Sequence, residues 1–454
     1  MSGNLTMDAL EAAASSGEID TVLACVTDMQ GRLMGKRFHV RHFLDHAHAE
    51  THGCDYLLAN DMEMVPVPGY ASASWDKGYG DYVHKPDLAT LRRVPWLPAT
   101  ALVMCDFRDH LGTSEIEIAP RTILKRQIAR AAEMGLQPMV ATELEFFLFQ
   151  DSFDALRDAG YRDLQPLGRY NLDYSILGTT KEEHVMRAIR NALFGAGIAV
   201  ENTKGEAETG QEEINIRYAG ALDTADGHVI TKNAVKEIAF AHGHAATFMA
   251  KYATDRAGSS AHIHQSLAGP DGPAFYDPDA PHTMSDTMRQ YLAGLLAHAD
   301  AITLALAPYV NSYKRFTEGL FAPTRAVWST DNRTAGFRVC GAGTQAVRIE
   351  CRVGGADLNP YIALAAQIAA GLDGIARNLE LEPETHGDIY QAEKARAIPT
   401  TLRAAADAFE SSQMLRAAMG DGVVDHYTRA ARWEIAEADR VVTDWDVARG
   451  FERA

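Results

Sequence analysis

Four strand-like stretches of this chain carry polar side chains at positions two apart, with apolar residues around them. The stretches are VATELEFFLF with Glu143 and Glu145, EEINIRY with Glu213 and Asn215, AHIHQSL with His262 and His264, and VRIECRV with Arg348, Glu350 and Arg352. Residues two apart on a strand point to the same face of the sheet. Each stretch therefore predicts a strand with one face directed at solvent or at a charged group.

Paired carboxylates such as Glu143 and Glu145 repel each other and resist burial unless a cation neutralises them or one carboxyl keeps its proton. One such pair alone is more typical of a half-exposed strand, but four polar pairs in one chain favour a shared site. Glu206, in the loop seven residues before Glu213, adds a further carboxylate. Oxygen ligands with one histidine suit Mg²⁺ or Mn²⁺ better than zinc or copper. The residues thus predict a divalent-metal site.

Arginines that suit phosphate chemistry follow residue 311: Arg315 in NSYKRF, and Arg333 and Arg338 in DNRTAGFR. Guanidinium groups bind phosphate and carboxylate bidentately, although a single arginine is more often an ion-paired surface residue. The sequence has no Walker-A loop. Its one glycine-rich match, residues 341–346, precedes a strand-like run instead of a helix, which argues against a dinucleotide-binding fold.

Composition narrows the classes of partner. The formal net charge of −18 disfavours nucleic acid and anionic membrane surfaces. No apolar run approaches the roughly 20 residues of a membrane span, and the N-terminus lacks the features of a signal peptide, so we expect a cytoplasmic protein. The five scattered cysteines fit reduced core thiols. Small molecules are the expected partners.

The order of patterns predicts an α+β chain of two unequal domains, 1–112 and 113–454. Residues 21–38 predict two strands joined at Gln30-Gly31, and ATALVMCDF predicts another buried strand. A helix is expected over 121–134, after Pro120, which suits a first helical turn. Beyond it, strands alternate with helical stretches, including 229–250 and 359–379, and helices are expected from about Thr401 onward.

Six ordered segments resemble the signature blocks of the glutamine synthetase family: ELEFFLF, GQEEINIRY, GSSAHIHQSL, NSYKRF, NRTAGFR and RIECRVGGADLNPYIALAAQIAAGLDGI. DMQGRLMGKRF and KPDLATLRRVPW resemble its N-terminal domain. The resemblance implies a small β-grasp N-terminal domain and a large catalytic domain with a curved antiparallel sheet flanked by helices. It also implies a homododecamer of two stacked rings, with active sites between neighbouring subunits.

The same resemblance implies at least two Mg²⁺ or Mn²⁺ ions in each active site and ATP as co-substrate. The positions that match ligands of the glutamate-side metal are Glu145, Glu206 and Glu213. Those that match ligands of the metal on the ATP phosphates are Glu143, His262 and Glu350.

The remaining matched positions concern substrates. Glutamate is expected at Gly258, Arg315 and Arg352, and the nucleotide at His264, Ser266 and Arg338. Arg333 and Arg338 match the arginines that meet the transferred phosphoryl group. The implied reaction has two steps: the γ-carboxylate of glutamate attacks ATP to give γ-glutamyl phosphate, and an amine then displaces phosphate.

The chain departs from the family where ammonium would bind. The acidic residue expected six positions after Arg315 is Phe321, and the Asp-Gly-Ser-Ser element of the N-terminal domain is absent. We therefore expect a primary amine in place of ammonia, with the Phe321 ring on its alkyl part and Asp61 or Glu63 on its ammonium group. A packing role for Phe321 is the plainer alternative.

Ethanolamine is the favoured amine, because a long diamine needs a second acidic site that the sequence does not identify. Putrescine or another polyamine is the nearest alternative. Glutamine synthesis from ammonia and a non-catalytic structural or regulatory role are the more distant ones.

Overall fold

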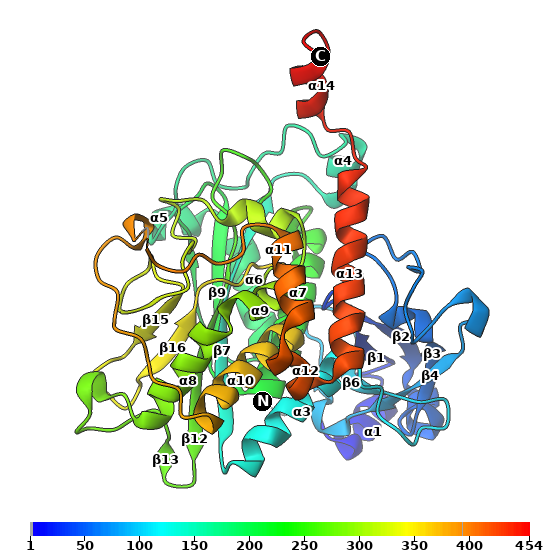
Figure 1. Cartoon of the computed structure of the whole chain (residues 1–454). Helices are drawn as coiled ribbons and strands as arrows, with labels where there is room; N and C mark the ends of the chain where they lie inside the picture. Colours follow the sequence, from blue (N-terminus) through cyan, green and yellow to red (C-terminus); the bar gives the residue numbers. More distant parts are fainter. Residues whose placement is uncertain (1–2, 393) are drawn as a thin grey trace.

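The computed structural model describes residues 3–392 and 394–454 as two β-sheets surrounded by helices (Figure 1). The first sheet has the order β2-β1-β6-β4-β3, with β5 paired to β6. Its strands are β1 (Thr21–Thr27), β2 (Leu33–His39), β3 (Thr51–Cys54), β4 (Asp81–Pro86), β5 (Arg92–Arg93) and β6 (Thr100–Arg108). β1 and β6 are parallel neighbours and the other pairs are antiparallel.

The second sheet has ten strands in the order β14-β15-β16-β12-β7-β9-β8, with β10 and β11 paired to β7 and β13 paired to β12. Its long strands are β7 (Gln137–Phe149), β8 (Val200–Gly205), β9 (Gln211–Ile216) and β12 (Ala261–Gly269). The shorter ones are β10 (Ala219–Gly220), β11 (Ala245–Thr247), β13 (Gly272–Pro273), β14 (Trp328–Thr330), β15 (Phe337–Cys340) and β16 (Arg348–Cys351). The predicted α+β class is confirmed.

The helices before residue 250 are α1 (Met7–Ser16), α2 (Val40–His42), α3 (Pro120–Glu133), α4 (Phe153–Asp158), α5 (Ile176–Thr180), α6 (Glu183–Gly195) and α7 (Ala221–Ala241). Those after it are α8 (Asp286–Ala297), α9 (Ala299–Leu306), α10 (Pro360–Ala376), α11 (Leu402–Ser411), α12 (Gln413–Met419), α13 (Asp421–Asp439) and α14 (Asp444–Gly450). Short 3₁₀ or π turns add Phe43–Ala47, Asp55–Leu58, Trp75–Lys77, Leu88–Thr90, Pro281–Thr283, Asn311–Arg315 and Ile389–Gln391. None of the helices in the described ranges is long and apolar enough to span a bilayer.

Most elements lie where the sequence places them. The hairpin of β1 and β2, strand β6 and helix α3 match the prediction, with Pro120 in the first turn of α3. The helix predicted over 229–250 is wrong at both ends, because α7 begins at Ala221 and ends at Ala241. Gly243 takes a φ of 78° there, a left-handed conformation that glycine adopts without strain and that ends a helix. The following residues form β11 instead.

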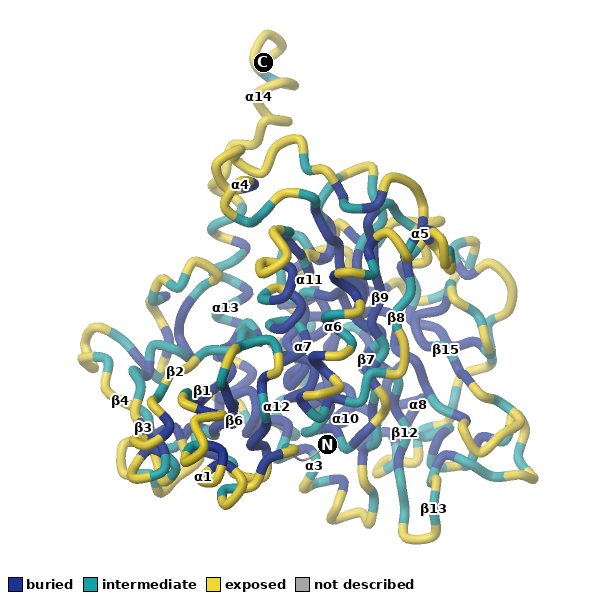
Figure 2. Tube along the Cα trace, turned by 180° about the vertical axis from the view of Figure 1, so that it is seen from behind, coloured by how far each residue is buried: buried dark blue, intermediate teal, exposed yellow. Residues whose placement is uncertain are grey.

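The core lies between the large sheet and the central helices, where Figure 2 draws the deepest burial. α10 is buried along almost its whole length and packs against α8, α3, α9 and α7. Apolar side chains of β7 such as Leu144 and Phe146 are also buried. Glu143 and Glu145 alternate with these apolar residues along β7, so their side chains point to the opposite face of the sheet.

A buried ion network joins the small sheet to the large unit. The Arg121 guanidinium of α3 lies 2.7 Å from Asp106, 2.8 Å from Asp87 and 2.9 Å from Asp226 of α7. Asn359 adds a hydrogen bond from its amide Nδ2 to the carbonyl oxygen of Met29 at 2.9 Å. Lys125 of α3 also pairs with Asp106, at 2.5 Å. These ion pairs join residues from both sides of position 112, and the domain boundary at that position stays a prediction from sequence.

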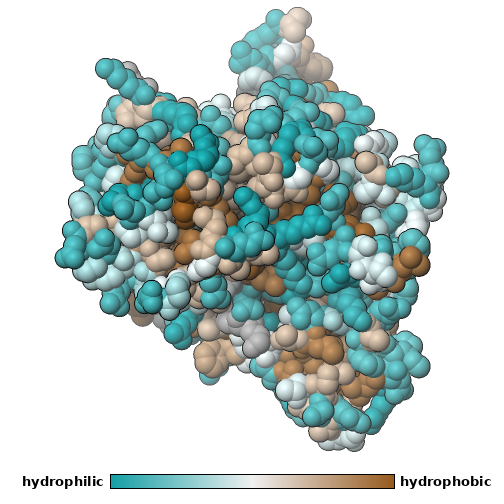
Figure 3. All heavy atoms as spheres, turned by 60° about the horizontal axis from the view of Figure 1, so that its bottom comes forward, coloured by the Kyte–Doolittle hydropathy of each residue, from teal (hydrophilic) through white to brown (hydrophobic). Residues whose placement is uncertain are grey.

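The surface is mainly hydrophilic on the face drawn in Figure 3, with hydrophobic residues in separate patches. All five cysteines are free thiols.

Helix α14 projects from the body and is exposed along its length (Figures 1 and 2). Its segment carries exposed apolar side chains: Val441, Val442, Trp445, Val447 and Phe451.

Candidate active site

The four polar strand faces meet because their strands are neighbours in one sheet, in the order β16-β12-β7-β9. The register of these strands determines which side chains lie opposite one another. Glu145 lies opposite Glu213, and Glu143 lies opposite both Asn215 and His262. On the other side of β12, His264 lies opposite Glu350. Cross-strand partners share a face and stand about 5 Å apart, so the polar rows of the four strands form one continuous surface.

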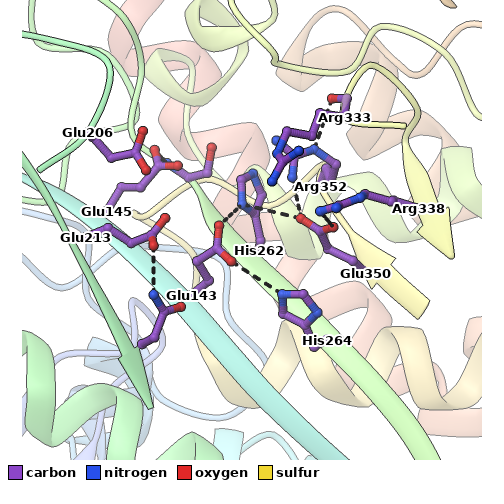
Figure 4. Close-up of polar contacts among 12 residues, drawn as sticks. Glu143, Glu145, Glu206, Glu213, His262, His264, Arg333, Arg338, Glu350 and Arg352 are labelled. Carbon is purple, nitrogen blue, oxygen red and sulfur yellow. Dashed lines mark hydrogen bonds and ion pairs between the residues drawn. The ribbon is translucent and has the colours of Figure 1, made fainter. Parts of the chain in front are cut away.

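Glu143, His262 and Glu350 form one half of this surface, the balanced half, on which negative and positive groups alternate (Figure 4). His262 Nδ1 donates to Glu143 Oε1 at 2.8 Å. Arg338 Nη1 donates to Glu350 Oε2 at 2.9 Å, and Arg352 pairs with the other oxygen of Glu350. Burial favours protonation of Glu350, but the charges of Arg352 and His262 outweigh it and hold its pKa at about 2.

His264 completes this half and its tautomer is fixed by two contacts. Arg348 Nε donates to His264 Nδ1 at 3.2 Å, so the imidazole proton is on Nε2, which lies 3.4 Å from Glu143 Oε2. Burial raises the pKa of Glu143, whereas the contacts to His262 and His264 lower it further than burial raises it. Glu143 is therefore ionised at neutral pH.

Glu145, Glu206 and Glu213 form the other half, the acidic half, on the far side of Glu143 (Figure 4). Glu145 has only 7% of its surface exposed. Burial, followed by the charge of Glu206, raises its pKa to about 8. Burial and the charges of Glu143 and Glu206 raise the pKa of Glu213 to about 10. Among the residues that the structure describes, Lys204, paired with Glu206, is the cation in contact with this half.

The donor atoms of the balanced half, and those of Glu145 and Glu213 together with Glu143, fit divalent cations, whereas Glu206 belongs to neither group. One ligand oxygen or nitrogen from each of Glu143, His262 and Glu350 lies within 4.8 Å of the others, and the same holds for Glu143, Glu145 and Glu213. His262 Nε2 is buried without a hydrogen-bond partner. An orphaned buried nitrogen beside crowded carboxylates is the arrangement that a metal ion satisfies. Carboxylate oxygens favour Mg²⁺ or Mn²⁺.

A cleft of about 1210 Å³ opens over the polar surface. Its walls include Glu143, Glu213, His264, Ser266, Arg333, Arg338 and Arg348. Arg338 is held by Glu350 and by exposed Asp331, so its guanidinium is fixed at the rim. Carboxylates on one wall and guanidinium groups on the other suit a polyphosphate with bound cations.

Gly258 and Arg315 lie together beside the acidic half, and Arg315 Nη2 donates to the backbone carbonyl of Arg352, whose own guanidinium pairs with Glu350 of the balanced half. A Cβ atom at Gly258 would lie 2.3 Å from Arg315 Cγ and 2.6 Å from the carbonyl oxygen of Ala250, so only glycine fits. Arg315 is 3% exposed, and its Nη1 donates to Ser260 Oγ at 3.0 Å. Its Nε is buried without a partner, which leaves a donor for an anionic ligand.

The three residues predicted for the amine do not meet within one chain. Phe321 is 55% exposed and has a φ of 55°; the next residue, Ala322, accepts a hydrogen bond from the hydroxyl of Tyr390 at 3.0 Å. Asp61 instead accepts a hydrogen bond from Trp433 Nε1 of α13 at 3.2 Å.

Glu63 also lies with α13. Burial, followed by the nearby charge of Glu63, raises the pKa of Glu434 in that helix. Among the residues that the structure describes, no hydrogen bond or ion pair joins Asp61 or Glu63 to the segment around Phe321.

Sequence reasoning missed two residues of the acidic half. Lys204 pairs with Glu206 and Asp173, and its ammonium lies 4.4 Å from the ring centre of Tyr174. Gln211 Nε2 donates to Glu145 Oε2 at 3.3 Å and to the carbonyl oxygen of Gly258 at 3.0 Å. Gln211 lies two positions before Glu213 on β9, so the same strand alternation that revealed Glu213 identifies it.

Known proteins share this architecture. The model of the glutamine synthetase catalytic domain matches residues 117–449. The gamma-glutamylethanolamide synthetase of Streptomyces coelicolor is 48% identical, over 99% of this chain and 96% of that protein. The glutamate–isopropylamine ligase of a Pseudomonas species is 36% identical, over 95% of both chains.

Solved structures agree with the sequence comparisons. The ligand-free structure of GmaS superposes with a TM-score of 0.85 at 28% identity, over 98% of this chain and 100% of that one. A complex of GmaS with ADP gives the same TM-score over 97% and 99%. From the match to its catalytic domain, the identity to its members and the shared fold, this chain belongs to the glutamine synthetase family, whose members are carbon–nitrogen ligases.

Proposed function

We propose that this protein is an ATP-dependent ligase that joins a primary amine, ethanolamine in the first place, to the γ-carboxylate of L-glutamate through γ-glutamyl phosphate. The observation that carries the proposal is that one cleft is lined by metal-binding carboxylates, by Arg338, which Glu350 and Asp331 hold, and by exposed Arg333. Carboxylates that hold cations and arginines that meet phosphate are what phosphoryl transfer requires. The Streptomyces relative named for γ-glutamylethanolamide supports the choice of amine.

Each half of the polar surface would hold one Mg²⁺ or Mn²⁺. Glu143, His262 and Glu350 would hold the ion on the ATP phosphates, and Glu145, Glu206 and Glu213 the ion beside glutamate. When bound, such ions supply positive charge that neutralises the phosphoryl oxygens and the γ-carboxylate. The ADP complex of the structural relative supports a nucleotide in the cleft.

The chain's own residues would position the reactants. Arg333 and Arg338 face the cleft, where they would stabilise the charge that spreads over the transferring phosphoryl group. His264 and Ser266 would contact the nucleotide. Gly258, Arg315 and Arg352 would hold glutamate, and the unpaired Nε of Arg315 is the donor available to its α-carboxylate.

The amine would enter beside Phe321, whose exposed ring can cover an alkyl chain. Asp61 and Glu63 of a neighbouring subunit would hold its ammonium group and take up a proton, since in their own chain they lie with α13. This arrangement calls for an oligomer. We propose a homododecamer of two stacked rings, and the exposed apolar side chains of α14 and the residues around it supply a surface that subunit contacts would cover.

The test is phosphate release by the purified protein with Mg²⁺, ATP and glutamate, with ammonia, ethanolamine, putrescine, spermidine and methylamine added separately. Mass detection of the product identifies the amide. A product with ethanolamine supports the proposal, one with a polyamine moves the assignment to that class, and one with ammonia alone makes the protein a glutamine synthetase. No turnover with any amine, despite ATP binding, indicates a non-catalytic member.

A further inference from the structure

Three histidines cluster outside the catalytic cleft, where α6 meets the turn between α7 and β11. His184 is the second residue of α6, His242 follows the last turn of α7, and His244 directly precedes β11. The ring centres of His242 and His244 lie 5.8 Å and 5.5 Å from that of His184. None of the three lines the cleft. His184 and His242 are exposed and His244 is half-buried, so ions in solution can reach the cluster.

The orientation of His244 is set by the backbone. Its Nδ1 lies 3.0 Å from the carbonyl oxygen of Gln150, the residue that follows β7. A carbonyl oxygen only accepts, so the proton is on Nδ1 and the lone pair is on Nε2. A histidine whose Nδ1–H donates to a backbone carbonyl is the arrangement that orients metal-binding imidazoles.

His184 Nε2 lies 3.3 Å from His244 Nε2. In the absence of a metal, His184 Nε2–H can donate to the lone pair of His244 Nε2 at this distance. Two nitrogens that each lie about 2.0–2.1 Å from Zn²⁺ at a tetrahedral angle are separated by about 3.3–3.4 Å. The observed distance also equals the edge of such a tetrahedron, so an ion could take the place of the shared proton.

We propose that His184 and His244, with His242 as a third ligand, form a Zn²⁺ site separate from the catalytic cations. Imidazole nitrogens favour zinc over Mg²⁺, so the ions that suit the carboxylate halves do not compete here. His242 is exposed and its ring centre lies 5.8 Å from that of His184, so it would have to rotate its side chain to become a ligand. Water completes the coordination.

Zinc at this position ties three elements together: α6, the end of α7 and, through His244 and Gln150, the end of β7. β7 carries Glu143 and Glu145, and β11 pairs with its last residues, Phe147 to Phe149. A ligand that binds only the folded state stabilises it in proportion to the logarithm of its concentration over its Kd. The site is therefore a stabilising clamp at one end of the catalytic strand.

The test uses the full-length protein stripped of metal and then saturated with Mg²⁺, which occupies the carboxylate halves. Zn²⁺ is titrated by calorimetry, and Co²⁺ is added as a spectroscopic probe because tetrahedral Co²⁺ absorbs strongly in the visible. We expect His184→Ala and His244→Ala to weaken binding at least tenfold and to remove the Co²⁺ band and the rise in melting temperature with Zn²⁺. His110→Ala, which removes an exposed imidazole elsewhere, keeps all three signals.

Equal Zn²⁺ stoichiometry and affinity in the parent protein, His184→Ala and His244→Ala would overturn the proposal, because all bound zinc would then lie at the carboxylates. Co²⁺ spectra of octahedral type in every variant would do the same. Both histidines stand at the surface or half-buried, and circular dichroism of each variant establishes that it folds before the comparison is made.

Discussion

The two halves of the polar surface both carry buried glutamates and differ in what surrounds these side chains. In the balanced half, Glu350 is flanked by Arg338 and Arg352, and its pKa is held at about 2. In the acidic half, Glu145 and Glu213 face each other across β7 and β9, and their pKa values rise to about 8 and about 10. The balanced half is ionised by the protein itself, and the acidic half requires a cation from outside.

The contrast implies different energetic roles. In the acidic half Lys204 pairs with Glu206 but not with Glu145 or Glu213, and these two buried carboxyl groups oppose folding when no metal is bound. Buried carboxylates with fixed arginines are satisfied before any ligand arrives, so the balanced half is preorganised. The following predictions separate the two.

The largest expected effect is on catalysis. Glu213→Gln removes a ligand oxygen of the acidic half, and kcat/KM is expected to fall about 100- to 1,000-fold, because a bound cation contributes several kcal/mol of charge stabilisation. The matched control is Glu212→Gln. Glu212 is also buried but contacts Glu182, and this variant should keep most of its activity. Steady-state kinetics at saturating Mg²⁺ makes the comparison, and similar losses in both variants would contradict it.

The next effect is on stability, with opposite signs in the two halves. Glu350→Gln leaves Arg352 and Arg338 without their carboxylate, and we expect the free energy of unfolding to fall by about 3 kcal/mol. Glu213→Gln removes a repelling carboxylate, and in a chelator the same quantity should rise. Denaturant unfolding in EDTA measures both. A rise for Glu350→Gln would show that the balanced half is not held by its arginines.

The pH dependence of stability should depend on added metal. Glu145 has a folded pKa of about 8 against an ordinary 4.5, so between these values the folded state binds the extra proton and stability falls as pH rises. Without divalent cation we expect Glu145 to contribute a loss of about 2–3 kcal/mol from pH 6 to 8, since one proton corresponds to about 1.4 kcal/mol per pH unit. Glu213, whose pKa is raised to about 10, adds a loss of the same sign. Mg²⁺ bound at these carboxylates should remove both contributions. Glu350 acts in the opposite sense, because its contribution is present above pH 4.5 and is lost as pH falls toward 2.

The smallest effect concerns amine choice. Phe321→Glu should shift the ratio of kcat/KM for ethanolamine over ammonia about tenfold toward ammonia, because it replaces an apolar contact by an acid that attracts ammonium. Leu320→Glu, at the adjacent exposed position, is the control for charge alone. If both variants shift the ratio equally, the ring of Phe321 does not contact the amine.

The alternation of polar and apolar residues along single strands predicted most of the polar surface. Each of Glu143, Glu213, His262 and Glu350 lies in a stretch with this alternation. It did not give the neighbours of those strands, because register depends on contacts between residues far apart in sequence. The family resemblance supplied the roles of Glu206 and Arg338.

One error has a physical cause. The end of α7 was misjudged because the residues after Ala241 keep a helical composition, while Gly243 turns the chain. The grouping of Asp61 with Phe321 stays a prediction, because within one chain Asp61 lies beside Trp433. Contacts between subunits leave no periodic signal in a sequence.

A competition assay between the two amines decides the proposed activity. The purified protein is given Mg²⁺, ATP and glutamate with ethanolamine and ammonium at equal concentration, and the two amides are quantified by mass spectrometry. We predict that γ-glutamylethanolamide predominates and that ADP forms in equal amount to total amide. Glutamine as the main product, or ATP left unconsumed, would contradict it.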